Sequence, residues 1–409
     1  MEAMGSRARA AAELLRKAPA EQRGAAIAAA ARALRTRSEA ILAANAADVA
    51  GATNLVAANL VDRLRLDRGR LEAMAAALDE MASRPDVIGE EMERWTRPNG
   101  LDIARVRTPI GVVGMIYESR PNVTADAAAI CLRSANAVIL RPGSEALRSC
   151  LAIHDAIAAG VAEAGLPDGC AQIVPVSDRD AVGLMLEGLS GSIDLIIPRG
   201  GAALVERVAR DAKVPTLGHL EGLCHSYVHA SADLDMAIRI LADAKMRRTS
   251  VCGATETLLV DRAVAPELLP RLADALAGCE LRGDSESRRH APMAQADESD
   301  WSTEYLAPIL AVRAVTGLDE AVDHIRRYGT GHTEAIVCED RAVAEAFLAG
   351  VDSAIVMWNA STQFADGGEF GFGAEIGIAT GRLHARGPVG ADQLTCFNYR
   401  IRGSGQIRG

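Results

Sequence analysis

Aromatic residues are scarce in this chain. Phe, Trp and Tyr make up only 3% of its 409 residues, although 49% of the residues are hydrophobic and 37 are glycines. Small aliphatic residues must therefore fill most of the core, which favours closely packed helices and tight turns over an aromatic-rich β-sandwich. The length exceeds the usual size of one domain, so we expect two or three domains.

The chain also lacks the marks of a nucleic-acid binder, a membrane protein and a disulfide scaffold. Its formal net charge is −10, whereas a general nucleic-acid binder needs a basic surface. No apolar run approaches the roughly 20 residues of a transmembrane helix. Its eight cysteines form no CxxC pair and are expected to be free thiols, mostly buried and inert. We expect a cytoplasmic protein that binds neither nucleic acid nor membranes.

The hydrophobic pattern changes along the chain. Residues 6 to about 83 have the spacing of helices, and 85–100 is a polar connection. Residues 101–117 alternate like strands with a turn at Pro109–Gly111, and the tail 394–409 alternates too. We expect this tail to pair either with 101–108 or with another subunit.

Apolar strands and helices alternate from residue 122 to about 212 and again from 222 to 360. Such alternation predicts parallel sheets covered on both faces, that is, two doubly wound α/β domains. There is no GxGxxG fingerprint. A nucleotide site is suggested only by the architecture, where a strand, a short loop and a helix start meet at Arg141–Ser144 and at Arg199–Gly201.

Histidines cluster in HLEGLCHSYVH, residues 219–229. On a strand, His225 and His229 would share a face but lie roughly 13 Å apart, so one metal ion could not take both without a bend. We therefore interpret these residues as strand and turn residues and expect no metal.

Two further positions have a structural and a functional interpretation each. Asn122, in YESRPNVT, lies where an α/β sheet binds ligands and could donate to an oxyanion, but its spacing alone favours a helix cap or a turn residue. Cys252, in RRTSVCGATETLLV, follows Arg247 and Arg248, whose charge would favour a reactive thiolate. A buried core cysteine is the alternative, and that short window alone favours it. The glycines of 367–388 indicate either a ligand loop or turns.

Twelve ordered segments carry a resemblance that covers nearly the whole chain. They include PIGVVGMIYESRPNVT, NAVILRPGSEA, DLIIPRGG, VCGATETLLV, RYGTGHTEAIV and DGGEFGFGAEIGI. In these motifs the chain resembles the gamma-glutamyl phosphate reductases of the aldehyde dehydrogenase superfamily. The resemblance implies NADPH-dependent reduction of L-glutamate 5-phosphate to L-glutamate 5-semialdehyde in proline biosynthesis, with release of phosphate.

The resemblance also implies a domain plan and partners. Residues 1–225 would bind NADPH, 226–365 would carry the catalytic cysteine, and 366–409 would return to an oligomerisation arm to which 95–108 contribute. A homo-oligomer is implied, and so is a hand-off of substrate from glutamate 5-kinase.

Residue roles carry over onto the matching motifs. Cys252 aligns with the nucleophilic cysteine of the family, and Asn122 aligns with the asparagine that stabilises the oxyanion in the superfamily. Residues at the cofactor positions are Arg141, Ser144, Glu145, Gly200, Gly201 and Glu304, and we choose Arg120, Asn359, Ser361 and Thr362 as candidates for substrate binding.

Some positions depart from the family pattern. Gly253 replaces an asparagine, Pro142 replaces a glycine, and Arg-Arg-Thr-Ser precedes the cysteine where Gln-Arg-Pro-Gly is usual. His219 falls near the glutamate base of hydrolysing relatives, with Glu221 two residues on. A thioester-hydrolysing aldehyde dehydrogenase and a non-catalytic binder with the same fold are the alternatives.

Overall fold

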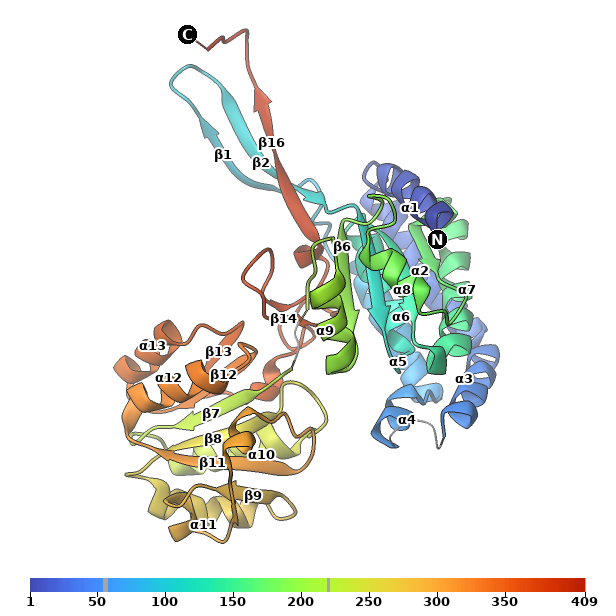
Figure 1. The fold of residues 1–409 in the computed structure, drawn as a ribbon. Helices are drawn as coiled ribbons and strands as arrows, with labels where there is room; N and C mark the ends of the chain where they lie inside the picture. The colour runs from blue at the N-terminus through green and yellow to red at the C-terminus, as the bar shows by residue number, and fades with distance from the viewer. Residues whose placement is uncertain (54–57, 219–220, 409) are drawn as a thin grey trace. The chain divides into compact units, whose positions relative to one another are not determined.

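The computed structural model of the protein describes residues 1–53, 58–218 and 221–408 (Figure 1). The chain divides into two compact units. Unit 1 comprises Met1–Gly218, Gly371–Gly377 and Val389–Gly409, and unit 2 comprises His219–Phe370 and Ile378–Pro388. None of the helices in the described ranges combines the length and the apolar character needed to cross a bilayer.

Unit 1 is built on a four-stranded parallel sheet in the order β5-β4-β3-β6. Its two middle strands are buried along their whole length, as expected for a sheet covered on both faces. The strands are β3 (Val112–Tyr117), β4 (Ala137–Pro142), β5 (Ala171–Ile173) and β6 (Leu195–Arg199).

Small residues let the helices of unit 1 pack closely. A Cβ at Gly160 of α7 would lie 2.4 Å from the backbone nitrogen of Ala30 in α2, so only glycine permits this approach. Helix α2 also packs against α5. The helices are α1 (Glu2–Leu15), α2 (Ala20–Thr36), α3 (Ser38–Ala52), α4 (Ala58–Leu64), α5 (Arg68–Ser83), α6 (Asn122–Arg133), α7 (Leu147–Glu163), α8 (Asp180–Leu186) and α9 (Ala202–Asp211).

A second, three-stranded antiparallel sheet in unit 1 forms an extended arm (Figure 1). It consists of β1 (Glu91–Thr96), β2 (Asp102–Pro109) and β16 (Thr395–Arg402). The tail pairs with β2 from Thr395↔Pro109 to Arg402↔Asp102, which confirms the first of the two predicted pairings. The polar connection predicted over 85–100 is wrong for 91–96, because this charged, exposed strand shows no apolar alternation.

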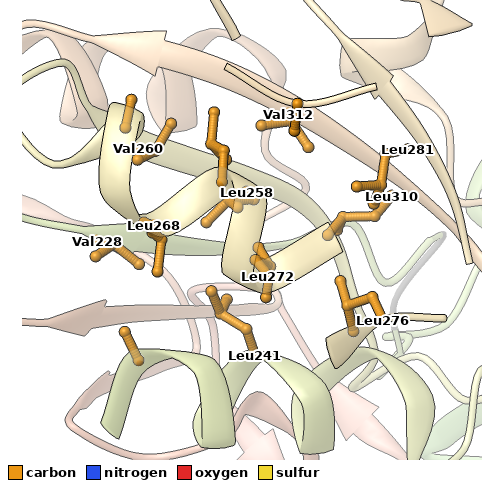
Figure 2. Close-up of a cluster of buried hydrophobic side chains, with 14 of the residues drawn as sticks. Val228, Leu241, Leu258, Val260, Leu268, Leu272, Leu276, Leu281, Leu310 and Val312 are labelled. Carbon is orange, nitrogen blue, oxygen red and sulfur yellow. The ribbon is translucent and has the colours of Figure 1, made fainter. Parts of the chain in front are cut away.

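Unit 2 contains a seven-stranded parallel sheet in the order β10-β9-β11-β8-β7-β12-β13. Helices α10 and α11 contribute to the leucine-rich core on one side of it, shown in Figure 2, while α12 and α13 contribute to a separate core cluster. The strands are β7 (Cys224–Val228), β8 (Thr255–Asp261), β9 (Glu280–Gly283), β10 (Ala294–Gln295), β11 (Ile309–Val315), β12 (Thr333–Val337) and β13 (Ile355–Trp358).

Aspartate side chains cap two helices of unit 2, α10 and α13. Asp233 accepts a hydrogen bond from the Met236 amide at the start of α10, and Asp340 accepts from the Ala342 amide at the start of α13. The helices are α10 (Leu234–Met246), α11 (Ala265–Ala275), α12 (Gly317–Tyr328) and α13 (Arg341–Gly350), and a small hairpin joins β14 (Ile378–Ala379) to β15 (Gly387–Pro388).

Candidate active site

Cys252 lies in the turn 247–254 that joins α10 to β8 in unit 2. Cys252 is half-buried, so it is neither fully enclosed by the core nor fully exposed to solvent. The thiol of buried Cys224 donates a hydrogen bond to the carbonyl oxygen of Cys252 at 3.0 Å. The turn is thus anchored from β7, the strand beside β8.

Six of the other seven cysteines have surroundings that make their thiols poor nucleophiles. Burial raises the pKa of Cys150 and Cys170 to about 12 and that of Cys279 and Cys338 to about 11. It also raises the pKa of Cys131 and Cys224 far above the ordinary thiol value. The eighth, Cys396, is exposed on the arm strand β16. A thiol held protonated does not attack, so Cys252 is the cysteine of the α/β units best suited to chemistry.

The turn that carries Cys252 is braced by the short helix η5, Thr362–Phe364. The side-chain amide of Gln363 donates to the carbonyl oxygens of Ala244 and Arg248, both at 3.1 Å. The buried hydroxyls of Thr362 and Thr255 lie 3.0 Å apart. The structure therefore fixes both ends of the 247–254 turn against one segment.

Three residues predicted to bind substrate have their side chains engaged within unit 2. The Asn359 side chain bonds to the backbone of Cys338 in both directions, accepting from its amide and donating to its carbonyl oxygen. Ser361 caps η5 by accepting from the Gln363 amide, and Thr362 pairs with Thr255. Their roles toward substrate stay predictions.

Glu304 lies in the segment between η4 (Glu298–Ser302) and β11. This segment is held by a buried ion pair, in which the Lys245 ammonium lies 2.5 Å from the Glu256 carboxylate. The second oxygen of Glu256 accepts from the Leu306 amide at 3.2 Å. Burial raises the pKa of Glu256 to about 7, Lys245 opposes this, and the charge of Glu304 adds to the rise. Burial above all, and to a lesser degree the charge of Glu304, raise the pKa of Cys224, whose thiol contacts the cysteine turn.

Asn122 belongs to unit 1 and is the first residue of α6. Its side chain does not cap the helix, so the cap interpretation is wrong. Instead its Nδ2 donates to the Asp126 carboxylate at 2.9 Å. The buried hydroxyls of Tyr117 and Thr124 lie 2.6 Å apart and fasten the start of α6 to the end of β3. Arg120 lies in the turn between them.

The predicted cofactor residues of unit 1 lie at the carboxyl ends of β4 and β6. Arg141 is the penultimate residue of β4 and is buried, and its guanidinium donates to the Ser177 carbonyl oxygen at 3.1 Å. Its Nε has no hydrogen-bond partner. Burial lowers the pKa of Arg141, while Glu145 and Glu118 oppose the shift. The exposed Ser144 opens the turn that follows β4.

Two acidic side chains at this edge make contacts that the sequence did not reveal. Glu145 reaches back to the Ser119 amide at 2.6 Å. Glu118 accepts from the Gly201 amide at 3.0 Å, at the start of α9. A Cβ at Gly200 would lie 2.4 Å from the Glu118 carboxylate, so a side chain there would have to displace this flexible group. Glu118 was not predicted, because nothing in YESRP marks a bond to a residue 83 positions away.

The histidine segment has structural contacts. The Nδ1 of buried His225 lies 2.9 Å from the Glu334 carboxylate, and the Nδ1 of His229 lies 3.0 Å from the Ser231 hydroxyl. Across 1–53, 58–218 and 221–408, no three His, Cys, Asp or Glu side chains gather as metal ligands would. His219 falls outside the described residues, and the half-buried Glu221 begins the range that follows.

Comparison with known proteins gives consistent matches over the chain. The model of the aldehyde dehydrogenase family matches residues 1–305. A gamma-glutamyl phosphate reductase of Caulobacter vibrioides is 62% identical over 412 residues, with 100% of both chains covered. A protein of the same name from Parvibaculum lavamentivorans is 58% identical, with 100% of this chain and 97% of the relative covered.

Solved structures agree with these matches. A gamma-glutamyl phosphate reductase of Thermotoga maritima is similar with a TM-score of 0.96 at 42% identity, covering 99% of each chain. An acetylating aldehyde dehydrogenase of Geobacillus thermoglucosidasius is similar in fold alone, with a TM-score of 0.70 at 19% identity, covering 99% of this chain and 97% of that one.

The parallel α/β units and the cysteine turn before β8 define an oxidoreductase of the aldehyde dehydrogenase fold, which confirms the predicted fold class. The full-length similarity then narrows the class further. The chain belongs to the gamma-glutamyl phosphate reductase family.

Proposed function

We propose that the protein reduces L-glutamate 5-phosphate to L-glutamate 5-semialdehyde with NADPH, in proline biosynthesis, through a thioester on Cys252. The observation that carries this proposal is full-length similarity at 62% identity to a relative named for the activity. The half-buried Cys252, in a braced turn next to the buried thiol of Cys224, supports the assignment of the nucleophile.

The chemistry follows from the reactivity of an acyl phosphate. The Cys252 thiolate attacks the carbonyl carbon, phosphate leaves with the electron pair of the broken C–O bond, and a thioester remains. Negative charge develops on the carbonyl oxygen during the attack. We propose that the Asn122 amide and the backbone N–H of Cys252 donate to this oxygen.

We propose that fewer side chains bind the substrate than the sequence suggested. The side chains of Asn359, Ser361 and Thr362 are engaged within unit 2, so we propose that this segment contributes through its shape and backbone. We assign Arg120 to the anionic groups of the substrate, because its turn directly precedes Asn122.

A nicotinamide dinucleotide is the cofactor class, since proteins of this fold include a glyceraldehyde-3-phosphate dehydrogenase of Methanocaldococcus jannaschii solved with NADP. When bound, it supplies the hydride that reduces the thioester. The residues present fit such a group. Arg141 retains a buried Nε without a hydrogen-bond partner, and the Gly200–Gly201 turn begins α9, where a helix start favours phosphates. Glu304 would contact the nicotinamide ribose.

The choice of NADPH over NADH rests on Glu145 and Arg141. In NAD enzymes an acidic side chain after a sheet strand commonly binds the ribose 2′-hydroxyl, and it repels a 2′-phosphate. Oε1 of Glu145 accepts from both the amide and the hydroxyl of Ser119, and we propose that these bonds hold the carboxylate away from the ribose. The cation of Arg141 and the hydroxyl of Ser144 are then the groups offered to a 2′-phosphate.

Assembly and compartment complete the proposal. The arm exposes Phe397, Tyr399 and Ile401, which suits contact with a second copy of the chain. None of the eight cysteines forms a disulfide in the described ranges, which suits a reducing cytoplasm. An acyl phosphate is prone to hydrolysis, so direct hand-off from glutamate 5-kinase would protect it.

The test is a coupled assay. Glutamate, ATP and a glutamate 5-kinase should make the purified protein oxidise NADPH, and Cys252→Ala should abolish this while the protein stays folded. Semialdehyde oxidation that yields free glutamate without phosphate would instead indicate a hydrolysing aldehyde dehydrogenase. If NADPH failed to raise the thermal unfolding temperature, a non-catalytic role would be favoured.

A further inference from the structure

The amide of Asn122 has a partner that the sequence motifs did not assign. Asn122 is exposed at the start of α6, and one of its Nδ2 hydrogens goes to Oδ2 of Asp126, four residues along the helix, at 2.9 Å. Residues at this spacing lie on the same face of a helix. The bond therefore sets the direction of the whole amide group.

The chemical character of the partner matters. A carboxylate only accepts hydrogen bonds, whereas a side-chain amide has one accepting and one donating end. Asp126 therefore selects the rotamer in which the nitrogen of Asn122, and not its oxygen, lies on its side. An amide nitrogen carries two hydrogens, so one remains to donate elsewhere.

We propose that Asp126 is a positioning residue for the oxyanion site: its carboxylate holds the Asn122 amide so that the second N–H can donate to the thioester oxygen. This inference rests on the proposed function. It assigns Asp126 no contact with substrate, and its effect passes through Asn122 alone.

The surroundings of Asp126 make this positioning sensitive to pH. Its side chain is partly buried, and burial raises the pKa of its carboxyl to about 6, while the bond from Asn122 and the charge of Arg199, at the end of β6, oppose the rise. Below that pKa the neutral acid can donate its own proton to Oδ1 of Asn122 and favour the turned amide. The rate should then fall as the pH drops through about 6.

A purely structural role would look different. An amide–carboxylate pair at this spacing stabilises a helix by a few tenths of a kcal/mol at most. Its loss would change the unfolding temperature slightly and leave the turnover of the folded enzyme alone. The turnover rate, and not the stability of the protein, therefore distinguishes a positioning role of Asp126 from a purely structural one.

The experiment is a double-mutant cycle on the full chain in the coupled assay. Asp126→Ala should lower kcat about tenfold with little change in KM, because a misdirected donor loses most of its effect. Asp126→Ala in an Asn122→Ala background should cost nothing further. Asp126→Asn, which still offers an accepting oxygen, should recover most of the rate and lose the fall near pH 6.

The outcomes are distinguishable. If Asp126→Ala keeps the wild-type kcat, or if its loss is the same with and without Asn122, Asp126 does not act through Asn122 and the inference is wrong. Equal losses in Asp126→Ala and Asp126→Asn would also overturn it. An unmutated protein without NADPH-dependent activity would overturn the proposed function, and the inference with it.

Discussion

Gly222 lies directly against Cys252. A Cβ atom at residue 222 would be 2.4 Å from the Cβ of Cys252 and 2.5 Å from its carbonyl oxygen. Non-bonded carbon atoms do not approach so closely, so any side chain at 222 must push the cysteine turn aside. The position of Cys252, the proposed nucleophile, therefore depends on a glycine outside its own motif.

Gly222→Ala should impair catalysis more than folding. We expect kcat to fall at least tenfold because the thiol is displaced, and the free energy of unfolding to fall by about 1–3 kcal/mol from the crowding. Urea unfolding and the coupled assay measure the two effects. Gly350→Ala is the matched control, since no atom lies within 4 Å of a Cβ there and the residue ends a helix. Equal effects of both substitutions would contradict the argument.

The Lys245–Glu256 pair predicts a large stability loss. Both side chains are fully buried, so Lys245→Met leaves Glu256 as an uncompensated buried acid. We expect a loss of about 3–5 kcal/mol in the free energy of unfolding. In Lys245→Met/Glu256→Gln, a neutral amide can still accept from the Leu306 amide, so much of the loss should be regained. Arg326→Met, which removes an exposed ion pair with Asp323, should change stability by less than about 1 kcal/mol.

Much of the fold follows from local patterns. The buried runs of β3, β4 and β8 and the alanine-rich helices were predictable, because parallel strands and packed helices leave strong apolar signals. β1 and β9 were missed since both are short and rich in charge, and their pairing comes from neighbouring strands. Pattern alone does not reveal such strands.

The site was less predictable than the fold, for a physical reason. A motif can mark Cys252 and Asn122, but it does not show what holds them. Gly222, Gln363 and Asp126 act through contacts that depend on the folded chain. The same holds for Asn359 and Thr362, whose polar side chains suggested ligand contacts and are engaged inside unit 2.

Glu118 predicts an effect on cofactor affinity. Its carboxylate accepts from the Gly201 amide, the group that we expect to face the cofactor pyrophosphate. The Glu118 carboxylate must leave this amide before the pyrophosphate can bind to it. Glu118→Gln should therefore bind NADPH several-fold more tightly, which corresponds to a binding free energy more favourable by about 1 kcal/mol. Titration of NADPH fluorescence measures the affinity. Weaker binding would instead identify Glu118 as a cofactor ligand.

Asp126 predicts how stability varies with pH. Because its folded pKa of about 6 exceeds the ordinary value of 3.8, the folded state binds more protons than the unfolded state between these limits. The contribution of Asp126 to stability therefore declines as the pH rises from about 4 to 6. The free energy of unfolding of Asp126→Asn, relative to that of the unmutated protein, should therefore be about 1–3 kcal/mol higher at pH 7 than at pH 4. Urea unfolding at both pH values measures this, and a constant difference would contradict the shifted pKa.

The arm predicts the oligomeric state. Strands β1 and β16 are exposed along nearly all of their length, and Tyr399 and Ile401 keep 55% and 59% of their surface accessible. A three-stranded sheet with so little burial of its own gains stability when a partner covers it. Tyr399→Asp with Ile401→Asp should therefore shift sedimentation toward the monomer.

The matched control for the arm is Leu14→Asp, at an apolar residue 55% exposed on α1, which should leave the sedimentation unchanged. Far-UV circular dichroism should show that both variants keep their secondary structure. If the arm variant sediments like the unmutated protein at every concentration, the arm does not mediate association. A monomeric unmutated protein would contradict the proposed homo-oligomer itself.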